Sequence, residues 1–98
     1  MKRIQYKEYS TRSGVLYVAP KHIMDKIFSA GFKVNICGKK GHKSLQVFSR
    51  ENGKKRYIGM LSHFIKCPNF DEYVTFNDNN QFNLRVSNLK VNQYDLNA

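Results

Sequence analysis

The sequence predicts a single α+β domain: a helix near the N-terminus, a three-stranded antiparallel sheet and a C-terminal ββα unit. Two patterns predict this fold class. Apolar side chains recur at helical spacing between residues 20 and 30, and at every second position in the segments that follow. Turn residues divide those segments at 38–41 and at Asn52-Gly53. With 98 residues, of which 41% are hydrophobic, the chain can bury one small core.

The first segment, residues 1–19, is expected to form a basic N-terminal arm that ends in a strand. Residues 15–18 are the candidate strand, and Ser13-Gly14 before them is a turn signal. Such arms can follow phosphates or enter a minor groove, although chain ends also fray without any role. The basic residues of the arm are Lys2, Arg3, Lys7 and Arg12.

The second segment, residues 20–66, is expected to hold a helix, the sheet and a short second helix. Pro20 suits the first position of a helix over residues 20–30, and Gly31 suits its C-terminal cap. Its apolar residues form one stripe, which we expect to pack against the sheet. The stripe consists of Ile23, Met24, Ile27 and Phe28.

The sheet is predicted from three alternating segments, residues 32–37, 44–50 and 55–58. Asn52-Gly53 favours a tight hairpin turn, because both residues tolerate positive φ. A basic turn at 38–41 joins the first two segments. The result is an antiparallel meander, and residues 60–66 follow it as a short helix that Pro68 stops.

One face of this meander should carry polar and basic side chains, which are the types that contact phosphates and base edges. A ribbon of two or three strands also fits a DNA major groove. A polar face that is merely solvated is the plainer alternative. We expect Asn35, Gln46, Arg50 and Arg56 to contact base edges. The expected DNA-binding residues are Lys33, Asn35, Lys39, Lys40, Lys43, Gln46, Arg50, Lys54, Lys55 and Arg56.

Net charge points to the same class of ligand. The chain carries +10, and residues 1–66 hold fifteen Lys and Arg against three acidic residues. Residues 67–98 hold two basic and four acidic residues. This asymmetry predicts a localised surface for a polyanion, whereas a solubilising surface would mix both signs along the chain.

The third segment, residues 67–98, combines a β-rich run at 73–76, a polar turn at 77–80 and Leu84-Arg85-Val86-Ser87-Asn88-Leu89. It resembles the HNH motif of phage-type homing endonucleases, in which a strand ending in Asp-His precedes a loop and an Asn-Arg-x-x-Asn-Leu signature. The similarity extends over about residues 44–92, because the turn and strand from Asn52 also match. The resemblance implies a ββα unit and a phage or mobile-element origin.

In this register Phe76 falls on the catalytic His, Thr75 on the metal-binding Asp, and Leu84 on the Asn before the Arg. Asn97 falls near a metal ligand at the end of the family motif. Phenylalanine can neither bind a divalent ion nor activate water, and threonine is a poor replacement for a carboxylate. The resemblance therefore implies a degenerate unit that has lost cleavage, with Phe76 packed into the fold and Asp78 as a nearby remaining acid.

A second resemblance covers residues 32–66. A meander that ends in Gly-Lys-Lys-Arg-Tyr-Ile-Gly and continues into a short helix is similar to the plant ethylene-response-type DNA-binding domain. Homing enzymes of phages often carry similar modules. This resemblance also implies that the sheet is the part that binds DNA.

One other constellation could carry chemistry. Two short Cys/His pairs have residue types that bind zinc, although their spacing across a hairpin turn is unusual for a zinc knuckle. The alternative is a buried cysteine, a half-exposed cysteine and surface histidines, and we expect no cofactor. The four residues are Cys37, His42, His63 and Cys67.

The sequence has no run of 18 apolar residues and its first residues lack the apolar core of a signal peptide, so we expect a cytoplasmic protein in a bacterial host. The leading hypothesis is a non-catalytic, sequence-specific double-stranded DNA-binding protein, such as a transcriptional repressor, that can dimerise on a two-fold site. One alternative is a phage-encoded inhibitor that binds an acidic host protein. The other is a surviving metal-dependent nicking endonuclease.

Overall fold

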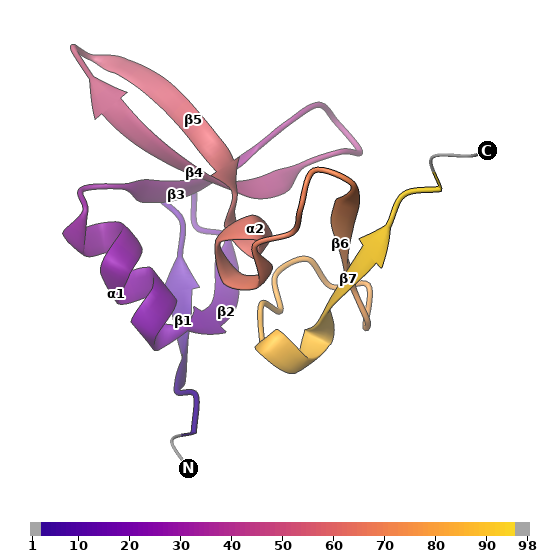
Figure 1. Ribbon diagram of the computed structural model, residues 1–98. Coiled ribbons are helices and arrows are strands. Elements are labelled where there is room, and N and C mark those ends of the chain that lie inside the picture. The colour runs from indigo at the N-terminus through magenta and orange to yellow at the C-terminus, as the bar shows by residue number, and fades with distance from the viewer. Residues whose placement is uncertain (1–2, 96–98) are drawn as a thin grey trace.

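The computed structural model describes residues 3–95 and has strands as its dominant elements (Figure 1). The strands form a two-stranded sheet, β1-β2, a three-stranded sheet, β3-β4-β5, and a second two-stranded sheet, β6-β7. The elements are β1 (Tyr6–Ser10), β2 (Leu16–Pro20), α1 (Lys21–Ser29), β3 (Lys33–Cys37), β4 (Ser44–Glu51), β5 (Lys54–Met60), α2 (Leu61–Lys66), β6 (Glu72–Phe76), the 3₁₀ turn η1 (Val86–Asn88) and β7 (Leu89–Gln93). The predicted α+β class is therefore wrong, because this part of the chain is mostly β with two short α-helices.

The N-terminal arm is replaced by a hairpin. β1 pairs with β2 from Tyr6 opposite Pro20 to Ser10 opposite Leu16. Thr11 closes the turn: its carbonyl accepts from Gly14 and its hydroxyl accepts from the Val15 N–H at 3.1 Å. A strand pair thus opens the fold where a basic arm was predicted, and the candidate strand at 15–18 overlaps β2. Lys2 of the expected arm lies outside the described residues.

The helix α1 lies where the apolar stripe placed a helix, but it is the third element of the fold. Met24 and Ile27 are its buried residues, and Pro20 stands at the N-cap rather than inside the helix. Gly31 follows with φ of +85°, a left-handed conformation that suits glycine. The Gly31 N–H donates to the Phe28 carbonyl and ends the helix.

The three-stranded meander is confirmed. β3 and β4 pair from Lys33 opposite Phe48 to Cys37 opposite Ser44, and β4 continues into β5 through the Asn52-Gly53 turn. Both turn residues have positive φ, 53° and 76°, as a type I′ hairpin turn requires. A bulge lies between Val47 and Phe48 in the β4-β5 pairing.

The predicted ββα unit is not present. β6 pairs instead with β7, with Phe76 opposite Leu89, and the loop between them holds the short 3₁₀ turn η1 in place of an α-helix. The physical reason lies in Leu89–Gln93, where apolar and polar residues alternate and so favour a strand. Asn97, the expected end of the motif, falls outside the described residues.

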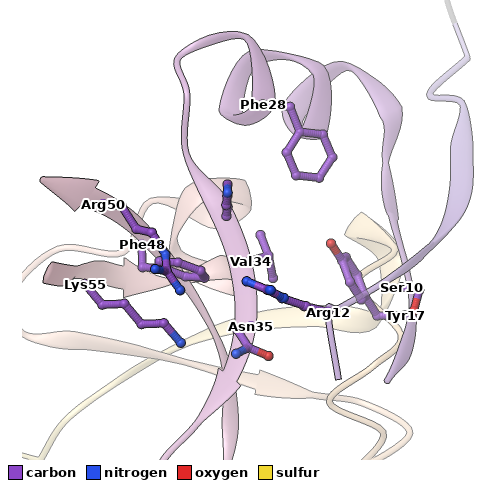
Figure 2. A pocket seen from close by; sticks show the side chains of 10 residues that line it. Ser10, Arg12, Tyr17, Phe28, Val34, Asn35, Phe48, Arg50 and Lys55 are labelled. Carbon is purple, nitrogen blue, oxygen red and sulfur yellow. The ribbon is translucent and has the colours of Figure 1, made fainter. Parts of the chain in front are cut away.

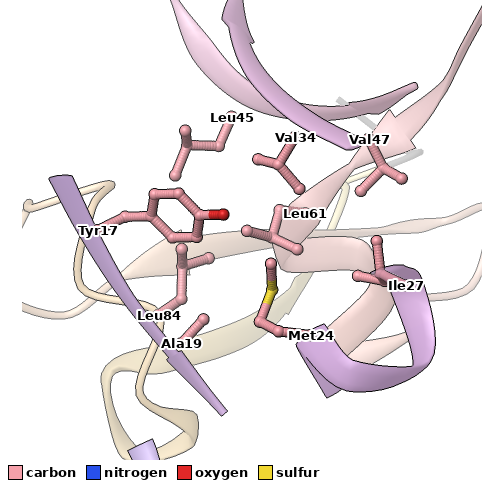
Figure 3. Packing of buried hydrophobic residues seen from close by; sticks show 9 residues of the cluster. All are labelled: Tyr17, Ala19, Met24, Ile27, Val34, Leu45, Val47, Leu61 and Leu84. Carbon is pink, nitrogen blue, oxygen red and sulfur yellow. The ribbon is translucent and has the colours of Figure 1, made fainter. Parts of the chain in front are cut away.

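Apolar residues from the β1-β2 and β3-β4-β5 sheets, both helices and the loop between β6 and β7 form one core (Figure 3). Leu84 is 1% exposed and reaches this core from the long loop between β6 and β7. Its backbone N–H donates to the Val18 carbonyl at 2.8 Å, and the Phe82 carbonyl accepts from the Val18 N–H at 2.8 Å. The N-terminal hairpin and the C-terminal unit are therefore joined directly. The buried cluster comprises Tyr17, Ala19, Met24, Ile27, Val34, Leu45, Val47, Leu61 and Leu84.

Neither α-helix in residues 3–95 has the length and apolar character that crossing a membrane requires.

Candidate nucleic-acid interface

The β3-β4-β5 sheet presents two chemically different faces. Val34, Leu45 and Val47 are buried on the inner face, against the helices. Because neighbours in a strand point to opposite sides and paired residues share a side, the register defines the other, outer face. The outer face carries Lys33, Asn35, Cys37, Ser44, Gln46, Phe48, Arg50, Lys55, Tyr57 and Met60.

A hollow of about 200 Å³ lies where this face meets the N-terminal hairpin. We call it the basic pocket, because four of the residues that line it are Arg12, Lys33, Arg50 and Lys55. Figure 2 shows Arg12 on one side of β3, with Arg50 and Lys55 on the other. The remaining wall of the basic pocket is formed by Ser10, Tyr17, Phe28, Val34, Asn35 and Phe48.

The turn that carries Arg12 is held against β3. The Ser13 hydroxyl donates to the Asn35 side-chain oxygen at 3.3 Å, and Thr11, which is 5% exposed, anchors the turn from inside. The same Asn35 oxygen accepts from the Ile36 N–H at 2.9 Å. The side-chain NH₂ of Asn35 makes no hydrogen bond within residues 3–95, so it remains as a donor in the pocket wall.

Phe48 forms an apolar floor that positions one of the cations. Its side chain is 5% exposed, and its ring centre lies 5.6 Å from that of Tyr57. The Lys55 ammonium lies 5.2 Å from the centre of the Phe48 ring, a cation–π geometry worth about 0.5–1 kcal/mol at exposed sites. The bulge next to Phe48 is the kind of feature that re-aims side chains at a functional edge.

The charges in the basic pocket have one sign. None of its lining residues is acidic, and its four cations form no ion pair in the part of the chain that the structure describes. Arg56 differs: it pairs with Ser49 on the opposite face and lies 3.9 Å from the Glu51 carboxylate. Like charges held close together without counter-charges favour an anionic ligand.

The structure brings together only part of the predicted DNA-binding set. Lys33, Asn35, Arg50 and Lys55 meet in the pocket. Gln46 lies on the same face beyond it, half-buried, and donates to the Ser44 hydroxyl at 2.8 Å. Three further lysines, Lys39, Lys40 and Lys43, are exposed in the loop that joins β3 and β4, and Lys54 begins β5.

These flanking lysines are carried by projecting segments. The β3-β4 loop and the β4-β5 hairpin extend away from the body of the protein (Figure 1). The Cα radius of gyration, 14.1 Å, accordingly exceeds the roughly 13 Å typical of a compact chain of this length. The loop and the hairpin turn lie at opposite ends of β4, which spans about 26 Å at 3.3 Å per residue.

Sequence reasoning missed Arg12 and Ser10 as pocket residues. Arg12 was expected to be free in an arm, but the turn closed by Thr11 brings it to β3. The signal was present in the tight spacing of Thr11, Ser13 and Gly14, which favours a local turn.

The positions that match the nuclease motif have structural partners. The Thr75 hydroxyl accepts from the Asn92 amide at 2.9 Å, and Phe76 packs against the core, as its apolar side chain predicted. The Asp78 carboxylate accepts from Asn83 and Asn88 side chains at 2.9 and 2.8 Å. These bonds, together with one from the Asn80 N–H, lower the pKa of Asp78. Asp78 therefore organises the loop.

The four candidate zinc ligands do not converge. Within residues 3–95, no three His, Cys, Asp or Glu side chains are placed to share a metal ion. Cys37 is half-buried at the end of β3, while Cys67 is exposed after α2. Cys37 instead lies beside Tyr57, where a hydrogen bond between the two raises the Tyr57 pKa.

No protein-family model, no curated protein and no solved structure matches this chain. Its function is therefore inferred from the residues of the interface.

Proposed function

We propose that the protein binds double-stranded DNA through the outer face and the basic pocket without cleaving it, and that it acts as a regulator such as a transcriptional repressor. One observation carries the proposal: Arg12, Lys33, Arg50 and Lys55 surround one hollow in which no acidic residue takes part. Lysine and arginine neutralise phosphates and supply most of the salt-dependent affinity for DNA. The outer face adds amide side chains that can read bases.

The dimensions of the sheet suit a duplex. Three strands at about 4.8 Å spacing give a ribbon roughly 10 Å across, close to the roughly 12 Å width of a major groove. Asn35 and Gln46 are opposite each other on neighbouring strands, so their amides can approach one base step together. Glutamine can bind adenine through both amide atoms, which makes Gln46 the candidate for base readout. Asn35 can contribute only its NH₂ group, because its side-chain oxygen already accepts from Ser13 and Ile36.

The exposed lysines at the two ends of β4 fit the same picture. Lys39, Lys40 and Lys43 lie at one end of β4 and Arg50 and Lys55 lie toward the other, and the two ends are about 26 Å apart along the strand. Lys54 pairs with Glu51 and belongs to the opposite face. Ends that far apart can reach phosphates on both sides of a groove. Contacts of this kind position a protein on DNA but carry no sequence information.

Binding without cleavage agrees with the residues near β6. Phe76 cannot accept a proton, and the Thr75 hydroxyl already accepts from Asn92. The Asp78 carboxylate is engaged by three N–H groups of its own loop. A metal-dependent nuclease needs free oxygen or imidazole ligands and a general base, and these residues do not supply them.

Selection from a random duplex library, followed by competition gel shifts, tests the proposal. A repressor should enrich one motif and bind it far more tightly than unrelated competitor DNA. Weak or indiscriminate binding would contradict sequence-specific recognition and favour the inhibitor that binds an acidic host protein. Nicking of a plasmid with magnesium or manganese would contradict the non-catalytic part. Light scattering of the complex would show whether a homodimer occupies the selected site.

A further inference from the structure

We propose that the basic pocket is a site for a dianionic phosphate monoester group, such as the terminal phosphate of a nucleic-acid strand or a small phosphate ester. Recognition of a terminal phosphate on a nucleic-acid strand rests on the proposed function, because it requires that the basic surface bind nucleic acid. The pocket itself is defined independently, by size, charge and donors.

Size limits the ligand to a small group. Pockets for whole cofactors or drug-sized molecules typically measure roughly 300–1,000 Å³. The basic pocket measures about 200 Å³, and aromatic side chains, Tyr17, Phe28 and Phe48, take part in its wall. A phosphate group fits a hollow of this size, whereas a complete nucleotide would have to project from it.

Charge favours a monoester over an internal diester. A phosphodiester carries a single negative charge, while a monoester carries about two at pH 7 because its second pKa is near 6. Four cations line the pocket and no carboxylate offsets them. The ligand that gains most from such a lining is the more highly charged one.

The pocket also offers donors with different geometries. Arg12 and Arg50 supply planar guanidinium groups, which can bind two phosphate oxygens at once. Lys33 and Lys55 supply ammonium groups, and Lys55 is positioned over the Phe48 ring. The Asn35 NH₂ group adds a neutral donor at the wall.

The test compares strands that differ only in one phosphate. Fluorescence anisotropy would measure binding of a labelled duplex bearing either a 5′-phosphate or a 5′-hydroxyl at its free end. We expect the phosphorylated end to bind about tenfold more tightly, the effect of one additional charge-assisted contact. Arg50→Gln should abolish this preference, while Arg56→Gln, on the opposite face, should keep it.

The preference should also depend on pH in a defined way. It should decline as pH falls through about 6, where the monoester becomes a monoanion. Neither histidine nor a carboxylic acid lines the pocket, so the change reports on the ligand. A preference that stayed constant through this range would contradict recognition of the dianion.

Nuclear magnetic resonance with inorganic phosphate separates the two sources of the ligand. If phosphate perturbs the amides of residues 12, 33, 35, 50 and 55 in the wild type but not in Arg50→Gln, the monoester site is supported. Those perturbations without any end preference would assign the site to a free phosphate ester. Absence of both effects, or equal loss in Arg50→Gln and Arg56→Gln, would overturn the inference.

A covalently closed duplex, which has no strand ends, separates failure of the monoester site from failure of the proposed DNA binding. If closed duplex binds tightly while phosphate has no effect, DNA binding stands and the monoester site fails. If the end phosphate matters but closed duplex neither binds nor competes, the monoester site stands and the proposal of internal duplex binding fails.

Discussion

Lys55 and Arg56 are neighbours in β5 but belong to opposite faces of the sheet. The Lys55 ammonium lies 5.2 Å from the centre of the Phe48 ring, at the wall of the basic pocket. The Arg56 guanidinium lies 3.9 Å from the Glu51 carboxylate on the other side. Adjacent residues of equal charge thus provide a matched pair for testing the proposed DNA binding by the outer face.

Two variants should distinguish base readout from phosphate contact by their different effects on DNA binding. Gln46→Ala removes an amide from the outer face, so we expect it to relax sequence preference, with a loss of about 1–3 kcal/mol confined to the preferred site. Lys39→Ala removes an exposed lysine, so we expect weaker binding to all sequences and a salt slope smaller by about 1. Gel shifts with preferred and random duplexes check this. Identical behaviour of both variants would show that the reading surface lies elsewhere.

The core contact between the N-terminal hairpin and the C-terminal loop should dominate stability. Leu84 is 1% exposed, and Leu84→Ala should lower the free energy of unfolding by about 2–5 kcal/mol. Phe70 is 95% exposed, so Phe70→Ala should change it by less than about 0.5 kcal/mol. Urea denaturation measures both. Similar losses for the two variants would contradict the packing of Leu84.

The loop that follows β6 should weaken in acid. Hydrogen bonds from Asn83, Asn80 and Asn88 hold the Asp78 pKa below its ordinary value of 3.8 in the folded state. The ionised carboxylate therefore stabilises the fold above that pH, and this contribution is lost as pH falls through the lower, folded-state pKa. Wild type should be more stable than Asp78→Asn at pH 6, and the difference should shrink toward pH 3 in urea denaturation. A constant difference would show that the Asp78 charge has no such role.

The basic β3-β4 loop depends on one glycine. Gly38 has φ of +131°, and a Cβ there would lie 2.5 Å from the His42 carbonyl oxygen. Gly38→Ala should therefore destabilise the protein by more than about 1 kcal/mol. Gly59→Ala is the control, because its Cβ would meet only Phe64, at 3.7 Å. The urea concentrations at the unfolding midpoints measure the stability loss of each variant. A smaller loss for Gly38→Ala than for Gly59→Ala would contradict the loop geometry.

Sequence patterns predicted the local elements where the signal was local. The stripe that includes Met24 and Ile27 located α1, and Asn52-Gly53 located the β4-β5 turn, because both patterns act over a few residues. The alternation through Val34 and Val47 also identified the buried face of the sheet. Such signals place elements but not their long-range partners.

The remaining features depend on contacts between distant segments. The basic pocket combines Arg12 with Arg50 and Lys55, and no periodicity links residues so far apart in the chain. The join between Val18 and Leu84 is similarly non-local. In the C-terminal unit, the motif resemblance favoured a helix over the alternation of Leu89–Gln93, and the pairing with β6 decided for a strand.

The most direct test of DNA binding by the outer face is the salt dependence of duplex affinity in Lys55→Gln and Arg56→Gln. If the account is correct, Lys55→Gln weakens binding and lowers the slope of log affinity against log salt by about 0.9, the value for one lost phosphate contact. Arg56→Gln should leave both quantities near those of the wild type. A larger effect of Arg56→Gln, or no effect of either change, would contradict the assignment of the DNA-binding face.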